Sequence, residues 1–482
     1  MMVSSIAHTS SAACLEGFPE DPAIEKHIEQ QDIVAGLYSF QEILDFGRAL
    51  FVAKFNECDG RGRPAATGID AKRVSAGPAF IRTSGPDANS CAGCHNEPTV
   101  GGSGDVVANV FVLAQALDPV TLSVDPSVSN ERNTLGLFGA GAIEMLAREM
   151  TAELQDQADG LSDGTHTLRS KGVEFEIVIK DGALVAAEGI DTDLVVRPFH
   201  QAGVVVSLRE FTVNAMNHHH GMQAEERFDL NPSAGFDPDF DEDGHRRELT
   251  VGDITAVTLF QAALGVPQQI VPQDIRQRFS THRGEQLFNI IGCARCHIPE
   301  MVLSDRRFVE PNPLNPPGTW SDSNLSYSFD MTREGPGPYL EANPAGGAVV
   351  RAYTDLKRHN LCDPENTPGA IRYFCNEQLD QGRPSQGERP GREYFLTRKL
   401  WDVGSSAPYG HRGHITTITE AILRHGGEGR QSRDNFVRLP AHYQRSVVDF
   451  LKTLRVPEHG GLVHGEVAES TQGESSRFFA VD

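Results

Sequence analysis

The chain has 482 residues, enough for two or three domains, and a formal net charge of -23. This acidic balance argues against nucleic-acid binding and is compatible with a cationic partner, although on charge alone a solvated acidic surface explains it more readily. The apolar fraction of 39% and the aromatic fraction of 7% are low for a globular protein, so we expect large cofactors to supplement the core. No stretch of the sequence is long and apolar enough to span a membrane.

Helical periodicity is clear near both ends of the chain. Residues 39–55, SFQEILDFGRALFVAKF, place apolar side chains at helical spacing and predict a helix. The Gly-x-x-Leu-Phe step inside this segment recurs at residues 284–288. Near the C-terminus, HYQRSVVDFLKTL puts Val447, Phe450 and Leu451 on one face and predicts a last helix.

Two copies of the pentapeptide Cys-x-x-Cys-His follow the two Gly-x-x-Leu-Phe steps, at residues 91–95 and 293–297. This is the signature of c-type haem attachment: two cysteines add to the porphyrin vinyl groups and the histidine binds the iron. A redox Cys-x-x-Cys pair or half of a zinc site are the alternatives, but neither explains a histidine after both copies. We therefore predict two covalently bound haems, held by Cys91, Cys94, His95, Cys293, Cys296 and His297.

Covalent haem attachment normally takes place outside the cytoplasm, where disulfides also survive, so we expect a periplasmic or extracytoplasmic protein. The N-terminal MMVSSIAHTSSAACLEG has no basic start and no apolar run of secretory length, so we expect a removed signal or a misassigned start codon. Cys362 and Cys375 lie close together in a loop-like stretch and could form a disulfide.

The region between the pentapeptides has a different pattern. Residues 165–198 contain alternating apolar and polar side chains around an Asp-Gly pair at 181–182, which predicts a small β-hairpin. Further along, carboxylates alternate before Gly244, and Asp239, Asp241 and Asp243 are candidate calcium ligands. Thr250 stands where a calcium loop has its bidentate glutamate, so a merely acidic loop is the alternative.

The second haem needs a sixth iron ligand, and the segment 400–429 offers three histidines for it. Met301 is too close to His297 to reach the opposite face of the haem. His425 follows a short predicted helix, TITEAILRH, which could aim the ring into a pocket. Any one of these histidines could instead lie on the surface or contact a haem propionate.

Residues 407–413 and 416–422 resemble the Pro-Tyr-x-His-Asp-Gly and Thr-Leu-Glu-Glu-Ala-Val run of bacterial di-haem cytochrome c peroxidases. From about 35 to 455, the chain is similar to the di-haem oxidoreductase, putative peroxidase branch, also labelled thiol-oxidoreductase-like. GPDANSCAGCHNEPTVGGSGD, ERNTLGLFGAGAIEML, SLREFTVNAMNHHHGMQAEERF and HGGEG carry this similarity. The resemblance implies that His425 takes the position of the second haem's methionine ligand, and it assigns His411 to cofactor binding.

The resemblance also implies a distal site over the first haem. Residues 207–222 match, without a gap, a family segment whose glutamate handles the peroxide proton. The family's glutamine, proline and glutamate fall on Phe211, Ala215 and Gly221, so all three are lost, which puts ordinary peroxidase chemistry in doubt. Histidines stand nearby instead, for acid–base work or iron ligation, with a metal-binding surface cluster as the alternative. The candidate catalytic residues are His218, His219, His220 and Glu210.

These patterns predict a mainly α protein with two cytochrome c-like haem domains, a small β-hairpin insertion and long loops. We expect the first haem domain at 35–160, the insertion at 161–250 and the second haem domain at 251–460. The expected function is a di-haem oxidoreductase that reduces hydrogen peroxide at the first haem, with electrons relayed by the second from an external donor such as a basic cytochrome. The alternatives are an oxidase of a protein or organic substrate and a pure electron-transfer cytochrome.

Overall fold

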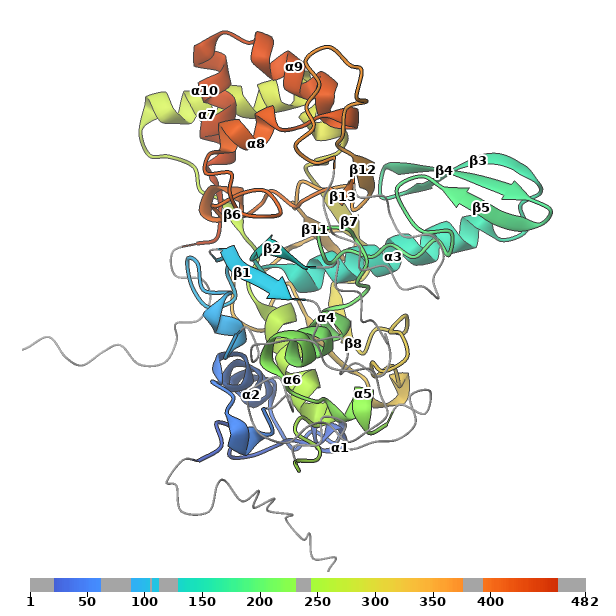
Figure 1. Ribbon diagram of the computed structural model, residues 1–482, viewed down its shortest axis with the longest axis vertical. Coiled ribbons are helices and arrows are strands. Elements are labelled where there is room, and N and C mark those ends of the chain that lie inside the picture. The colour runs from blue at the N-terminus through green and yellow to red at the C-terminus, as the bar shows by residue number, and fades with distance from the viewer. Residues whose placement is uncertain are drawn as a thin grey trace, which may run out of the picture.

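The computed structural model describes residues 21–61, 88–104, 106–111, 129–230, 244–375 and 393–457. Within these residues the chain is mainly helical with small antiparallel sheets, as predicted. Figure 1 shows two groups of helices at opposite ends of the molecule, with the long helix α3 (Ala140–Ala158) between them. Across the described ranges, no helix has the length and apolar character needed to cross a membrane.

At one end, helix α2 (Phe40–Val52) crosses helix α6 (Val251–Ala263). The predicted helix is confirmed, and Ser39 caps it by accepting a hydrogen bond from the Glu42 backbone N–H. A Cβ at Gly47 would lie 2.0 Å from the carbonyl oxygen of Ala256, so only glycine permits this crossing. Helix α6 thus packs on the first haem region although it opens the third expected range, and the three domain ranges stay predictions.

At the other end, helix α7 (Ile275–Ile290) crosses the predicted C-terminal helix, α10 (Ala441–Leu451), in the same way. A Cβ at Gly284 would lie 1.8 Å from the carbonyl oxygen of Ser446. Phe288 packs against Phe450, with ring centroids 5.6 Å apart. The repeated Gly-x-x-Leu-Phe step therefore forms equivalent helix crossings in both halves.

The insertion is a three-stranded antiparallel sheet that projects to one side in Figure 1, with strands β3 (Gly164–Ser170), β4 (Val173–Lys180) and β5 (Ala183–Ala187). The predicted hairpin is confirmed as β4 and β5. Its turn residues Asp181 and Gly182 both have left-handed φ angles, 55° and 74°, as a two-residue hairpin turn requires. Strand β3 was not predicted, and the buried side of the sheet packs on α3 through Phe175 and Ile177.

The remaining elements are short. The helices are α1 (Gln30–Val34), α4 (Leu208–Ala215), α5 (Glu225–Phe228), α8 (Ile418–Leu423) and α9 (Arg430–Arg438). The paired strands are β1 (Val106–Phe111) with β2 (Ser129–Asn133), β8 (Arg307–Glu310) with β9 (Tyr327–Asp330), β12 (Arg358–Asn360) with β13 (Tyr394–Leu396), and β6 (Gln268–Gln269) with β14 (Leu454–Arg455). A second three-stranded sheet has the order β10 (Glu341–Ala342), β11 (Ala348–Val350), β7 (Met301–Leu303). The predicted disulfide between Cys362 and Cys375 is present.

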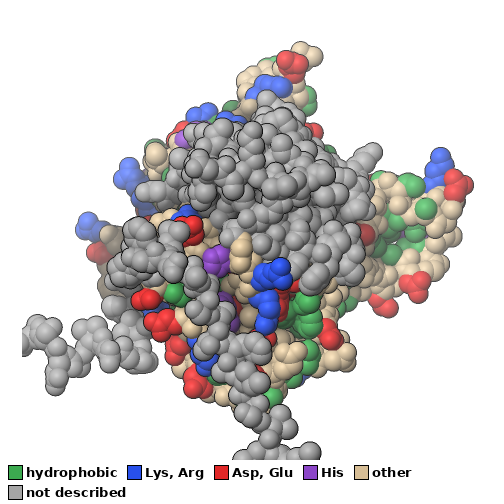
Figure 2. Space-filling model, turned by 60° about the horizontal axis from the view of Figure 1, so that its bottom comes forward, with side chains coloured by type: hydrophobic (Ala, Val, Ile, Leu, Met, Phe, Trp, Pro, Cys, Tyr) green, Lys and Arg blue, Asp and Glu red, His purple; other side chains and the backbone are tan. Residues whose placement is uncertain are grey.

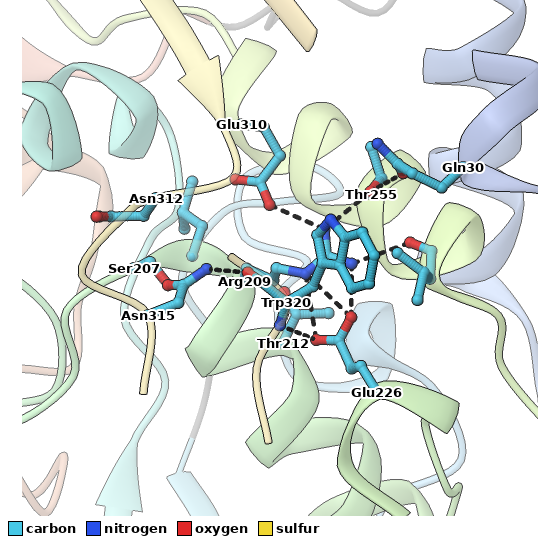
Figure 3. A network of polar contacts seen from close by, with 12 residues as sticks. Gln30, Ser207, Arg209, Thr212, Glu226, Thr255, Glu310, Asn312, Asn315 and Trp320 are labelled. Atoms are coloured by element: carbon cyan, nitrogen blue, oxygen red, sulfur yellow. Dashed lines mark hydrogen bonds and ion pairs between the residues drawn. The ribbon is translucent and has the colours of Figure 1, made fainter. Parts of the chain in front are cut away.

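A buried ionic network joins α4 to the elements around it (Figure 3). Arg209 donates to Glu226 at 2.5 Å, to Glu310 at 2.9 Å and to the Thr255 hydroxyl at 2.8 Å. Pairing and hydrogen bonding of this kind are what make a buried charge tolerable. Burial and the charge of the neighbouring Glu310 raise the pKa of Glu144. Glu144 accepts a hydrogen bond from the Leu208 backbone N–H and so fixes the start of α4.

Candidate haem and catalytic site

Both pentapeptides line one cavity of ≈ 570 Å³. This volume is typical of ligand-binding sites. Its wall combines apolar side chains with histidines from several separate segments of the chain, His200 and His359 among them. The pentapeptide residues in the wall are Cys91, Cys94, His95, Cys293, Arg295, Cys296 and His297. Segments 200 residues apart in the sequence therefore meet around a single space.

Each pentapeptide folds as one tight 3-10 turn, η2 (Cys91–Gly93) and η5 (Cys293–Arg295). The backbone N–H of His95 donates to the Cys91 carbonyl at 2.9 Å, and that of His297 donates to the Cys293 carbonyl at 3.0 Å. The turn places the cysteines and the following histidine at the cavity wall. Burial raises the pKa of the Cys91 and Cys293 thiols to about 12, so both are neutral thiols before any reaction.

His95 and His297 have matching surroundings. The Nδ1 of His95 lies 3.3 Å from the Gly102 carbonyl oxygen, and that of His297 lies 3.1 Å from the Tyr353 carbonyl oxygen. A carbonyl only accepts, so Nδ1 carries the proton and Nε2 keeps its lone pair for a metal. Burial lowers the pKa of both histidines to about 4, which holds them in the neutral, metal-binding form.

His425 lies opposite His297 in the cavity wall. It directly follows the end of α8, a helix that Thr417 caps, and the two imidazole centroids are 6.5 Å apart. Metal–imidazole bonds are about 2 Å long, so this separation leaves room for one metal ion between the rings. The Nδ1 of His425 donates to the Ala421 carbonyl at 2.9 Å, and burial lowers its pKa. The geometry fits the predicted sixth ligand of the second haem, an assignment that stays a prediction.

The three-histidine segment forms a π-helical turn, η4 (Met216–His220), which continues α4; such turns are frequent at functional sites. His219 and His220 both line the cavity, whereas His218 is not part of its wall. The Nε2 of His220 lies 3.4 Å from the Cys91 sulfur. The pKa of His95 is lowered chiefly by burial and further by the charge of His219, and both histidines line the same cavity.

The other predicted site residues lie in different places. His411 is buried and lines the cavity. Glu210 is buried outside the cavity wall, and its carboxylate accepts a hydrogen bond from the Val206 backbone N–H at 2.9 Å. The candidate calcium ligands Asp239, Asp241 and Asp243 fall outside the described residues.

Two cations in the cavity wall, Arg398 and Lys399, escaped the sequence analysis. The Arg398 charge contributes to the lowered pKa of His95. The Lys399 ammonium donates to two backbone carbonyls and to Asp402, and burial lowers its pKa to about 8. Two adjacent basic residues before an apolar Leu-Trp pair were the signal that could have identified them.

The donor set of the cavity fits two c-type haems. Each pentapeptide offers two thiols for the vinyl groups and one neutral imidazole for the iron. The apolar wall suits the porphyrin faces, and the cations between the two pentapeptides suit the propionate carboxylates.

Residues 373–454 match the family described as di-haem oxidoreductase, putative peroxidase, which confirms the resemblance found in the sequence and includes His425. The hydrazine synthase of Kuenenia stuttgartiensis, solved under xenon pressure, aligns with 14% identity and a TM-score of 0.35, over 94% of this chain and 99% of that chain. A MauG-like protein associated with microbial copper homeostasis aligns with 17% identity and a TM-score of 0.25, over 65% and 88%. Both scores are too low to carry an argument. No curated protein matches the chain.

Proposed function

We propose that this chain, whose C-terminal segment matches the di-haem oxidoreductases, reduces hydrogen peroxide at a first haem with electrons relayed by a second. The observation that carries the proposal is the single cavity into which both pentapeptides and two further sets of histidines open. A shared cavity brings two redox groups close enough to exchange electrons. A haem that peroxide can reach and a haem that it cannot reach, in one cavity, would suit one reactive centre and one relay.

The haems would be held by the two cysteines and the histidine of each pentapeptide, with His425 as the second ligand of the second iron. When bound, a haem supplies reversible one-electron transfer and, where one axial position is open, a site at which peroxide is cleaved. Arg398 and Lys399 would neutralise propionate charge and thereby orient the two rings relative to each other.

At the first site, His219 and His220 are the groups that can move a proton. Imidazole is the side chain best suited to this task near neutral pH. Reduction of one peroxide consumes two electrons and two protons and releases two water molecules. When the O–O bond breaks, a proton must move from the iron-side oxygen to the oxygen that leaves as water. We assign that proton transfer to His219, which lines the cavity together with His95. His220 is held by a contact of 3.2 Å between its Nδ1 and the Ala88 carbonyl.

At the second site, His297 and His425 would both bind the iron and close it to peroxide. Two imidazoles also give a lower potential than histidine with methionine. An external donor would supply the electrons. Figure 2 shows acidic and basic side chains interspersed on one face of the molecule, with no extended patch of one sign among its described residues. The proposal that a basic cytochrome is the electron donor rests on the net charge of the chain. The proposal of a periplasmic location rests on covalent haem attachment.

Two measurements test the proposal. Intact-mass analysis of protein made with a haem-maturation system should show two haem additions, and a peroxide assay with a reduced donor should show turnover. An oxidase of an organic or protein substrate would consume peroxide only with that substrate present. A pure electron carrier would have two low-spin haems and no reaction with peroxide, and that result would refute the proposal.

A further inference from the structure

A hydrogen-bonded tyrosine–histidine pair lies at the surface, apart from the residues used above. The Tyr373 hydroxyl lies 2.5 Å from the Nε2 of His414, and the ring centroids are 5.1 Å apart. Tyr373 belongs to a loop that the Cys362–Cys375 disulfide closes. His414 is exposed, so the pair can meet a molecule from solution.

A continuous row of packed rings connects this pair to the cavity. The centroid distances are 4.6 Å from Tyr373 to Phe374, 4.9 Å from Phe374 to Phe395, and 5.9 Å from Phe395 to His411. All three distances lie in the range of packed aromatic pairs, roughly 4.5–7 Å. Phe374, Phe395 and His411 line the cavity, and all three are buried. Tyr373 therefore contacts the cavity wall through side chains rather than through water.

The chemistry of the pair favours oxidation of the tyrosine. A phenol loses an electron readily only if its proton leaves at the same time, and an imidazole in hydrogen-bond contact can accept that proton. The Arg424 guanidinium lies 5.1 Å from the Tyr373 ring centroid and disfavours a positively charged ring. Glu420 pairs with Arg424 at 2.9 Å and offsets part of this charge. Transfer of the proton to His414 avoids the charged ring altogether.

We propose that Tyr373 is a redox-active tyrosine at which a small phenol or aromatic amine delivers electrons to the cavity. The proposal rests on the proposed function, because peroxide supplies the oxidant. One electron passes from Tyr373 to the oxidised haem, which is reduced by one electron, and the phenol proton passes to the Nε2 of His414. The external phenol then gives a hydrogen atom to the tyrosyl radical, and His414 releases its proton. Two phenols are oxidised for each peroxide reduced to two waters.

The test compares the two-haem protein with Tyr373→Phe, with His414→Gln and with Tyr339→Phe as a matched control. Tyr339 is an exposed tyrosine whose hydroxyl donates to the Gly335 carbonyl, outside the cavity wall. Peroxide added without a reductant should give a tyrosyl radical by electron paramagnetic resonance in the wild type and the control, and not in Tyr373→Phe. Guaiacol oxidation should fall roughly tenfold or more in Tyr373→Phe and in His414→Gln.

A second measurement needs no peroxide. Photogenerated ruthenium(III) tris-bipyridine oxidises the dithionite-reduced protein, and haem oxidation should be slower in Tyr373→Phe than in the control. If Tyr373→Phe keeps the radical, the guaiacol rate and the photochemical rate of the wild type, the inference is wrong. If peroxide leaves the wild-type haem spectrum unchanged, the proposed function fails, and the photochemical rates alone then decide the role of Tyr373.

Discussion

The two pentapeptides have matching surroundings on their helical side and different ones on the opposite side. Behind each lies a helix crossing at which glycine permits close contact. A phenylalanine ring lies near each histidine, with ring centroids 6.2 Å apart for Phe51 and His95 and 6.4 Å apart for Phe288 and His297. Opposite the second pentapeptide stands His425, fixed at the end of α8. Near the first, a π-helical turn contributes two cavity-lining histidines, and the Nε2 of His220 lies 3.4 Å from the Cys91 sulfur.

We therefore expect the functional difference between the two sites to come from the residues that face the pentapeptides, not from the helices behind them. The half that would attach the haem is duplicated and gives both histidines the same lowered pKa of about 4. The histidines that differ come from unrelated segments: His425 follows helix α8, and His219 and His220 belong to a π-helical turn. Changes to the opposite half should therefore alter chemistry, whereas changes to the shared half should alter stability.

His219→Ala should have the largest effect. If His219 moves the peroxide proton, the peroxide rate falls by about 10²-fold or more, while the spectrum of the second haem is unchanged. Stopped-flow absorbance after peroxide addition measures this rate. The control is His442→Ala, an exposed histidine on α10. A gain of high-spin signal instead would mean that His219 binds the iron, and an unchanged rate in both His219→Ala and His220→Ala would move the search to Glu210.

His425→Ala should open the second site and convert a low-spin haem into a high-spin one. His425→Met should stay low-spin, raise the midpoint potential and add a methionine–iron charge-transfer band. Spectroelectrochemical titration reads both changes. If the low-spin signal survives in His425→Ala, the ligand is another residue, and His411, which lines the same cavity, should be replaced next.

Gly47→Ala and Gly284→Ala test whether the two helix crossings are equivalent. Each added methyl group would clash with a carbonyl oxygen of the partner helix, and overpacking of this kind costs about 1–3 kcal/mol of unfolding free energy. We expect similar losses, each measured by denaturant unfolding of the two-haem protein. Gln286→Ala, an exposed change on α7, is the control. A loss at one glycine only would show that the two halves are not equivalent.

Glu144→Gln should remove a pH dependence of stability. Burial and Glu310 raise the folded pKa of Glu144 above its ordinary value of 4.5. Its contribution to the unfolding free energy is therefore full below pH 4.5 and is lost as the pH rises through the folded pKa. The unfolding free energy changes by at most about 1.4 kcal/mol per pH unit for one proton. Unfolding curves across this pH window should flatten in Glu144→Gln and stay unchanged in Glu176→Gln, an exposed carboxylate on β4. Equal slopes in the wild type and Glu144→Gln would contradict the assignment.

The sequence predicted the features that depend on local patterns. The helices at 40–52 and 441–451, the β4–β5 hairpin and the Cys362–Cys375 disulfide are confirmed, because periodicity, an Asp-Gly turn and close cysteines are visible within a few residues. The exact extent of the sheet was not visible, because β3 has an irregular alternation of exposed and buried side chains.

The features that depend on distant contacts could not be predicted. Arg209 meets Glu310 from 101 residues away, so neither residue shows its pairing in the sequence. Helix α6 is buried on every side and lacks an amphipathic pattern that would reveal its partner α2. The distinction between His218, which is absent from the cavity wall, and its two neighbours depends on the π-helical turn, which three consecutive histidines do not encode.

The glycine crossings also have a consequence for how freely the sequence can vary. Gly47 and Gly284 approach the backbone carbonyls of Ala256 and Ser446, not their side chains. The contact therefore restricts the residue type on only one of the two helices, the one with the glycine. The partner position is alanine in one half (Ala256) and serine in the other (Ser446). A duplicated unit of this kind can diverge on the partner helix while its geometry is preserved, because the restriction lies in an atom that every residue type possesses.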